Sequence, residues 1–81
     1  MKRENLSSRF TCVLAECLLS GYYSPSDTYR NVCIEMKIKG WLTEVENNRW
    51  ILTELGTNLA NKDRNTQKLV TVKHSINLSG L

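Results

Sequence analysis

The stretch KGWLTEVENNRWILTELG, residues 39–56, decides the fold of this 81-residue chain. Its second residue, Gly40, follows a segment in which apolar residues recur with helical spacing. Two asparagines, Asn47 and Asn48, separate two short runs rich in residues that favour β-strands, and a further segment starts at Thr53. Glycine commonly ends a helix, and asparagine pairs are typical of tight turns between strands. The stretch therefore predicts a β-hairpin placed directly between two helices.

A turn at the two asparagines sets the register expected for this hairpin. The expected cross-strand pairs are Glu46 with Arg49, Val45 with Trp50, and Glu44 with Ile51. Because side chains alternate between the faces of a strand, one face would pack on the helices. The residues expected on that face are Trp41, Val45, Trp50 and Leu52.

The segment before the hairpin predicts a helix over residues 26–39, preceded by a turn in GYYSPSD, residues 21–27. Ser24 is expected to cap this helix, with Pro25 in its first turn. Its apolar spacing divides the side chains between a buried side and an outer side. The buried side would hold Tyr29, Val32, Cys33 and Met36. The outer side would hold Asp27, Asn31, Ile34 and Ile38, with Arg30 between the two sides.

Further elements are expected on both sides of this unit. A first helix begins at Ser7 or Ser8 and ends near Gly21, because apolar residues recur there with helical spacing. Thr53 would cap a third helix, followed by a polar linker over residues 61–66. The inner stripe of that helix would be Leu55, Leu59 and Ala60. The tail LVTVKHSINL, residues 69–78, alternates with a period of two and predicts a terminal strand with His74 facing inward.

Composition limits what the chain can be. A length of 81 residues suits one small domain, which buries little surface and would gain stability from a partner or from a second copy, so a homodimer is expected. The formal net charge of +3 mildly favours binding to polyanions. No apolar run approaches the length of about 20 residues that a membrane span requires. The cysteines Cys12, Cys17 and Cys33 lie in apolar patterns, which suits reduced thiols in the cytoplasm. Cys12 is off the apolar stripe and is the candidate for a redox-sensitive thiol.

The order helix, turn, helix, hairpin, helix resembles the winged-helix DNA-binding superfamily, most closely compact bacterial regulators of the MarR and PadR kind. The resemblance covers residues 8–62 and is carried by TYRNVCIEMKIKG, residues 28–40, then WL, residues 41–42, and LTELGTNL, residues 52–59. It implies an α+β fold with a winged helix in residues 1–64. Residues 65–81 would add the C-terminal β-strand, paired within the chain or with a second copy.

The resemblance also implies double-stranded DNA as the partner and transcription regulation by site occupancy as the function. The helix over residues 26–39 would enter the major groove, with the hairpin against the backbone. The residues expected near bases are Thr28, Arg30, Asn31 and Ile34. Those expected near phosphates are Lys37, Lys39 and Arg49, with Lys2, Arg3 and Arg9 as further candidates. Small regulators of this kind are common on phages, plasmids and other mobile elements.

A second hypothesis keeps the same fold but assigns it to protein binding, as an inhibitor or adaptor. Two isoleucines on an outer helical face, Ile34 and Ile38, are as typical of a protein interface as of DNA contact. The terminal strand would then offer a further edge to the partner protein. For catalysis, the sequence shows none of the usual nucleophile, phosphate-loop or carboxylate motifs, and its three cysteines and His74 are a zinc-ligand set in name only. No enzyme, metal or cofactor is therefore expected.

Overall fold

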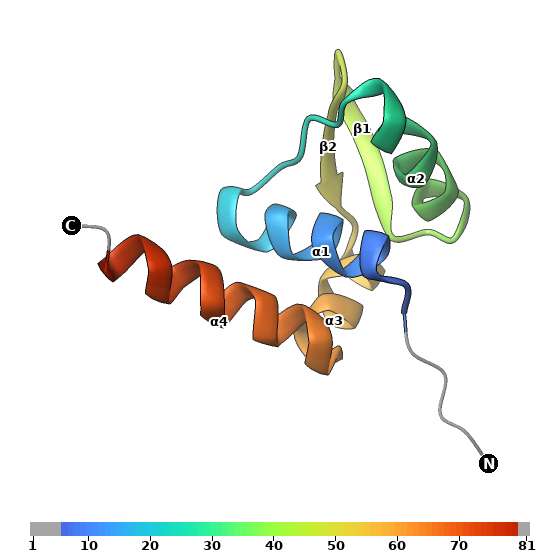
Figure 1. Cartoon of the computed structure of the whole chain (residues 1–81). Helices are drawn as coiled ribbons and strands as arrows, with labels where there is room; N and C mark the ends of the chain where they lie inside the picture. Colours follow the sequence, from blue (N-terminus) through green and yellow to red (C-terminus); the bar gives the residue numbers. More distant parts are fainter. Residues whose placement is uncertain (1–5, 80–81) are drawn as a thin grey trace.

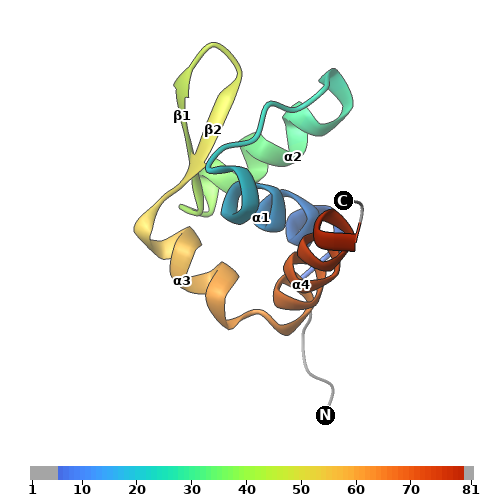
Figure 2. The same ribbon diagram turned by 90° about the vertical axis from the view of Figure 1, so that its left-hand side faces the viewer.

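The computed structural model describes the backbone of residues 6–79 and the side chains of residues 6–73. Within these residues the fold is α+β, with four helices and a two-stranded antiparallel hairpin. The elements are α1 (Ser8–Ser20), α2 (Asp27–Ile38), β1 (Leu42–Glu46), β2 (Arg49–Leu52), α3 (Glu54–Lys62) and α4 (Arg64–Ser79). Helix α1 lies in the middle, with α2 and the hairpin on one side and α3 and α4 on the other (Figure 1; Figure 2). None of the helices in the described part of the chain is long and apolar enough to cross a membrane.

The first helix confirms its predicted ends, while the second begins at a different cap. The Ser7 hydroxyl accepts the Phe10 backbone N–H at the start of α1, and Gly21 ends the helix at a φ of 87°. That φ belongs to the left-handed region, which glycine adopts without a steric penalty. The cap of α2 is Ser26 rather than Ser24, because the chain is still extended at Ser26 before it turns into the helix.

The predicted stop of α2 at Gly40 is confirmed. Gly40 has a φ of 89°, and its N–H donates to the Lys37 carbonyl at 2.9 Å. The next N–H, that of Trp41, donates to the Met36 carbonyl at 2.9 Å. These two bonds form a Schellman motif, which satisfies carbonyls left free at the helix end. The motif turns the chain from α2 directly into β1.

The core lies where α1, α2, the hairpin and α3 meet. Its members are Val13, Leu14, Cys17, Val32, Cys33, Met36, Leu42, Trp50 and Ala60. The buried side predicted for α2 is confirmed, with Tyr29 half-buried beside its three buried partners. Trp50 is only 2% exposed, as expected for a residue of the inward hairpin face. The burial of this one aromatic residue joins the hairpin to the helices.

The predicted register of the hairpin is partly wrong. Glu46 pairs with Arg49 as expected, but Glu44 rather than Val45 lies opposite Trp50. A bulge between Glu44 and Glu46 inserts one extra residue, which moves Val45 outward to 48% exposure. At a bulge, two residues of one strand face a single residue of the partner strand. A register counted from the turn is therefore wrong for the residues beyond the bulge.

The inner stripe of α3 also differs from the prediction at one position. Thr53 caps the helix as expected, since its hydroxyl accepts the Gly56 N–H at 3.0 Å. Gly56 and Ala60 are the buried residues of α3, whereas Leu55 is 56% exposed. The backbone of Gly56 lies against the Trp41 carbonyl, where a side chain has no room. The absence of a side chain thus decides which face of α3 packs inward.

The predicted C-terminal strand is wrong, because Arg64–Ser79 forms the helix α4. The linker predicted for residues 61–66 reduces to Asp63, whose carboxylate accepts the Thr66 N–H at 2.9 Å and the Thr66 hydroxyl at 2.7 Å. This is an N-terminal cap, and it starts a helix one residue after α3 ends. Burial then follows a helical period rather than an alternation, with Thr66 buried, Gln67, Leu69, Val70 and Lys73 half-buried, and Lys68, Thr71 and Val72 exposed. A helix satisfies its own backbone groups, whereas a lone strand requires a sheet edge. The side chain of His74 lies outside the described residues.

Candidate nucleic-acid interface

The outer side of α2 forms an exposed ridge, made of Asp27, Asn31, Ile34 and Ile38 and called the α2 ridge below. These positions repeat every three or four residues, so they lie along one line opposite the buried side. Ile34 is 40% exposed and Ile38 is 80% exposed, so neither packs fully within the chain. The ridge is therefore a surface that the core does not use.

The structure places all seven predicted site residues on the surface. Five of them lie on α2, Lys39 is the residue that caps its C-terminal end, and Arg49 is the first residue of β2. The exposed residues are Thr28, Arg30, Asn31, Ile34, Lys37, Lys39 and Arg49. Of the further candidates, Arg9 is exposed in the first turn of α1, while Lys2 and Arg3 lie outside the described residues. Exposure makes these side chains accessible to a partner but does not identify it.

The hairpin turn is bonded to the first turn of α2 through Asn48. Its side-chain oxygen accepts a hydrogen bond from Arg30 at 2.7 Å, and its amide donates to the Pro25 carbonyl at 2.7 Å. Its backbone N–H donates to the Glu44 carboxylate at 2.9 Å, and that carboxylate lies 3.8 Å from Arg30. We call Pro25, Arg30, Glu44 and Asn48 the turn junction. It positions the hairpin relative to α2. It also uses one of the hydrogen-bond donors of Arg30, the residue that the family resemblance places near the bases.

Asn48 is the residue of this surface that sequence patterns miss. Its φ of 56° is left-handed, a conformation that asparagine tolerates better than most residues. This preference predicts a turn and nothing more. The two partners of the Asn48 side chain lie 18 and 23 positions away along the chain, so no local spacing could have identified them.

The turn junction leads to a prediction about stability. We expect Arg30→Ala and Asn48→Gly to show a coupling free energy of about 0.5 to 1 kcal/mol in a double-mutant cycle measured by urea unfolding. Glycine keeps the left-handed backbone of Asn48 and removes only its side chain. The matched control is Arg30→Ala with Asn31→Ala, because Asn31 is exposed and takes no part in the hydrogen bonds of the junction. Coupling of equal size in both cycles would contradict the role of the junction.

Two other cations of the surface are held over aromatic rings. The Lys39 ammonium lies 5.5 Å from the Trp41 ring centroid and 5.9 Å from that of Phe10. The Arg49 guanidinium lies 4.3 Å from the Tyr22 ring centroid. Cation–π contacts of this kind orient a charge while leaving its hydrogen-bond donors free. Lys39 and Arg49 are thus oriented donors at the end of α2 and at the hairpin turn.

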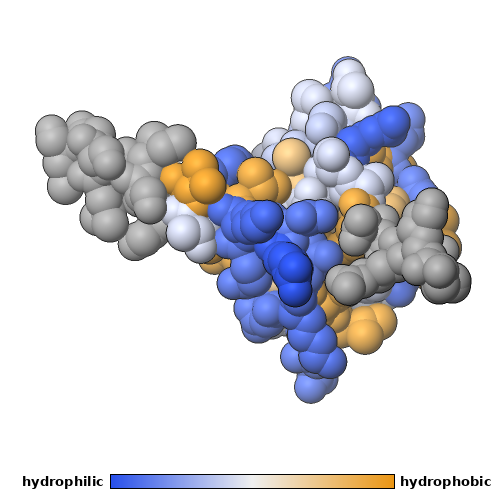
Figure 3. All heavy atoms as spheres, turned by 60° about the horizontal axis from the view of Figure 1, so that its bottom comes forward, coloured by the Kyte–Doolittle hydropathy of each residue, from blue (hydrophilic) through white to orange (hydrophobic). Residues whose placement is uncertain are grey.

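Positive charge is not confined to the α2 side of the molecule. Figure 3 shows that the face over α3 and α4 is largely hydrophilic. Its exposed polar side chains include Asn58, Asn61, Lys62, Arg64, Asn65 and Lys68. Helices α3 and α4 lie across α1 from α2 (Figure 1; Figure 2). Charge alone therefore does not select one interface, and the choice depends on the shape and chemistry of α2.

The cysteines divide into two buried thiols and one at a surface hollow. Burial, together with nearby Cys33 and Glu16, raises the pKa of Cys17 to about 12. Burial also raises the pKa of Cys33 to about 11, although Arg30 opposes the shift. Both thiols are therefore protonated and unreactive at neutral pH.

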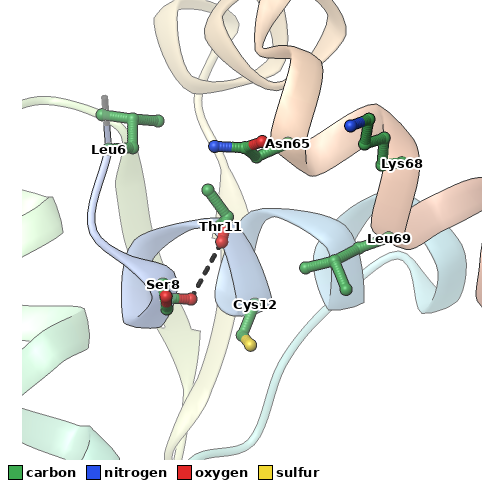
Figure 4. A pocket seen from close by; sticks show the side chains of 7 residues that line it. All are labelled: Leu6, Ser8, Thr11, Cys12, Asn65, Lys68 and Leu69. Atoms are coloured by element: carbon green, nitrogen blue, oxygen red, sulfur yellow. Dashed lines mark hydrogen bonds between the residues drawn. The ribbon is translucent and has the colours of Figure 1, made fainter. Parts of the chain in front are cut away.

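Cys12 is half-buried and lines the hollow between α1 and α4 that Figure 4 shows. The other side chains around the hollow are Leu6, Ser8, Thr11, Asn65, Lys68 and Leu69. The Thr11 hydroxyl, the buried polar group here, already donates to the Ser8 carbonyl at 2.9 Å. The hollow thus offers Cys12 as an accessible thiol but no unpaired buried group for a ligand.

Comparison of the chain with protein-family models, with curated proteins and with solved structures finds no match. Among the described residues, no group of three or more His, Cys, Asp or Glu side chains is placed to hold a metal ion. Any function of the chain therefore has to be inferred from its own surfaces, of which the α2 ridge and the turn junction are the most specific.

Proposed function

We propose that the chain is a winged-helix protein that binds double-stranded DNA and regulates transcription by occupying its site. Helix α2 would enter the major groove, whose width admits an α-helix, and the hairpin would lie against the backbone. The observation that carries the proposal is the division of α2 into a buried side and a side of exposed residues. The turn junction supports it, because it keeps the hairpin in a defined position beside the first turn of α2.

The proposal gives separate roles to the exposed side chains. Thr28, Asn31 and Ile34 would contact base edges, while Lys37, Lys39 and Arg49 would contact phosphates. Arg30 would act mainly by positioning the hairpin, although its donors beyond the one given to Asn48 remain able to bind a phosphate. Contacts to phosphates fix the register of a protein on DNA, and contacts to bases provide the specificity.

The same proposal includes assembly and location. Two copies would bind an inverted repeat, since a two-fold dimer matches the symmetry of such a site. The exposed Val72 on α4 is available for a contact between copies, in place of the strand that the sequence predicted. The protein would act in the cytoplasm, without catalysis, metal or cofactor.

DNA binding is tested with a pool of random duplexes at about 50 and 200 mM salt. If each of two chains neutralises three phosphates, we expect affinity to fall about a thousandfold between these concentrations, because bound counterions are released. The retained duplexes, once sequenced, should contain an inverted repeat. No retention at the lower salt concentration would refute the proposal.

Asn31→Ala tests the assignment of α2 within that experiment. We expect affinity for the selected duplex to fall about 10- to 100-fold, the usual cost of losing one side chain that hydrogen-bonds to a base. The matched control is Asn58→Ala, because Asn58 is also exposed but lies on α3. An equal loss in both variants, or no loss in either, would remove α2 from the DNA interface.

A second candidate function, protein binding, is favoured by the exposure of Ile38. In that case α2 would dock on a partner protein through Ile34 and Ile38, and the chain would act as an inhibitor or adaptor. The strand edge that was also expected to take part is not available, because α4 is a helix. Absence of DNA retention at low salt, with tight capture of one purified protein lost in Ile38→Ala, would establish this function instead.

A further inference from the structure

The α2 ridge has a chemical composition that the general proposal of DNA binding does not explain. After Asp27, it presents one amide side chain, Asn31, followed by two aliphatic side chains, Ile34 and Ile38. Exposed aliphatic residues are unfavourable in water, and Ile38 is 80% exposed. A partner that covers them must therefore offer apolar groups as well as hydrogen-bonding groups.

The major groove offers one apolar group, the 5-methyl of thymine. The thymine partner, adenine, presents a donor and an acceptor that match the amide of asparagine. The part of the ridge from Asn31 to Ile38, with one asparagine and two isoleucines, thus matches A·T base pairs better than G·C pairs, which present no methyl group in this groove.

The spacing along α2 is compatible with neighbouring base pairs. With a rise of about 1.5 Å per residue, Asn31 and Ile34 lie about 4.5 Å apart along the helix axis, and Ile34 and Ile38 about 6 Å apart. Base pairs follow one another at about 3.4 Å. For a helix lying along the groove, the three side chains therefore span about three base steps.

The charges on and beside the ridge are mixed. Exposed Lys37 and Lys39 flank Ile38 at the C-terminal end of α2. The exposed acidic side chains of the helix, Asp27 and Glu35, lie closer to the ridge line. The two cations at the C-terminal end are compatible with a polyanion. An aliphatic side chain between two cations suits a groove in which a methyl group lies between two phosphate backbones.

From these observations we infer that Ile34 and Ile38 recognise thymine methyl groups beside an adenine bound by Asn31, so that the target is an A·T-containing major-groove site. The inference rests on the proposed function and adds the class of sequence. It makes the two isoleucines determinants of specificity rather than a protein-docking surface.

The test compares thymine with uracil in the same duplexes. A pool of random duplexes is selected on the protein, and the retained pool is copied with deoxyuridine in place of thymidine, which removes only the 5-methyl groups. We expect binding to weaken about tenfold or more, because each isoleucine loses one buried methyl contact. Ile34→Ala combined with Ile38→Ala should bind the thymine and uracil pools almost equally. The matched control Leu55→Ala, a similarly exposed aliphatic residue on α3, should keep the full difference.

The other outcomes each overturn the inference, and they are distinguishable from one another. Salt-sensitive binding that is equal for thymine and uracil pools would leave the proposed function in place and remove the methyl contacts. Absence of binding to any pool would overturn the proposed function together with the inference. If Ile38→Ala changes the oligomeric state of the DNA-free protein, measured by sedimentation, the isoleucines would be assigned to a contact between two copies.

Discussion

Replacing Trp50 with alanine is expected to lower the free energy of unfolding by about 3 to 5 kcal/mol. The side chain is 2% exposed and belongs to the core cluster of helix and hairpin residues. Its loss would leave a cavity where the hairpin meets the helices, and a well-packed core closes such a cavity only in part. For a small domain this is a large share of the total stability. Urea unfolding followed by circular dichroism measures the change.

Trp50→Phe is the matched control for this effect. The indole Nε1 has no hydrogen-bond partner among the described residues, so phenylalanine loses volume but no hydrogen bond. The two backbone bonds between Trp50 and Tyr23, at 2.8 and 2.9 Å, do not involve the side chain and should persist. We expect Trp50→Phe to cost about 1 to 2 kcal/mol. Equal losses in the two variants would show that the ring does not stabilise the core by filling it.

Gly56→Ala is expected to destabilise the protein by about 3 kcal/mol, although alanine is the better helix former. A Cβ atom at Gly56 would lie 2.0 Å from the Trp41 carbonyl oxygen and 2.9 Å from its carbon. These are backbone atoms, and the same carbonyl accepts the Thr53 N–H at 3.0 Å. Relief of the overlap must therefore move α3 away from the start of the hairpin. The same urea titration measures the loss.

Gly21→Ala is the corresponding control, because it separates steric overlap from backbone conformation. A Cβ at Gly21 would meet nothing within 4 Å, but its φ of 87° is unfavourable for alanine. The expected cost is about 1 to 2 kcal/mol, the usual penalty of a left-handed non-glycine residue. A Gly56→Ala variant as stable as the wild type would mean that the approach of α3 to Trp41 is looser than described.

The elements up to residue 60 could be predicted because their determinants are local. Ser7, Gly21, Gly40 and Thr53 cap or end helices through bonds to residues three or four positions away. The two sides of α2 follow from its period, so the exposure of Asn31, Ile34 and Ile38 was also predictable. Local sequence thus identified both the hairpin and the helix face proposed to bind DNA.

The features that the sequence failed to predict depend on contacts between distant residues or on single irregularities. The run over residues 69–78 alternates like a strand, yet the cap at Asp63 and the contact of α4 with α1 make it a helix. The ion pair between Lys73 and Glu16 joins residues 57 positions apart, beyond the reach of any local pattern. One bulge at Val45 was enough to displace the register, because strand alternation transmits a single insertion to all residues after it.

The separation of the two sides of α2 has a consequence for how such a protein can diverge. Val32, Cys33 and Met36 hold the helix in the core, whereas Asn31, Ile34 and Ile38 contribute little to it. Exposed positions without core contacts usually change stability by less than about 0.5 kcal/mol when substituted. Selection can therefore exchange the ridge residues one by one and change the chemistry of this surface while folding is preserved. For the engineer, the same three positions form a small library in which almost every member should fold.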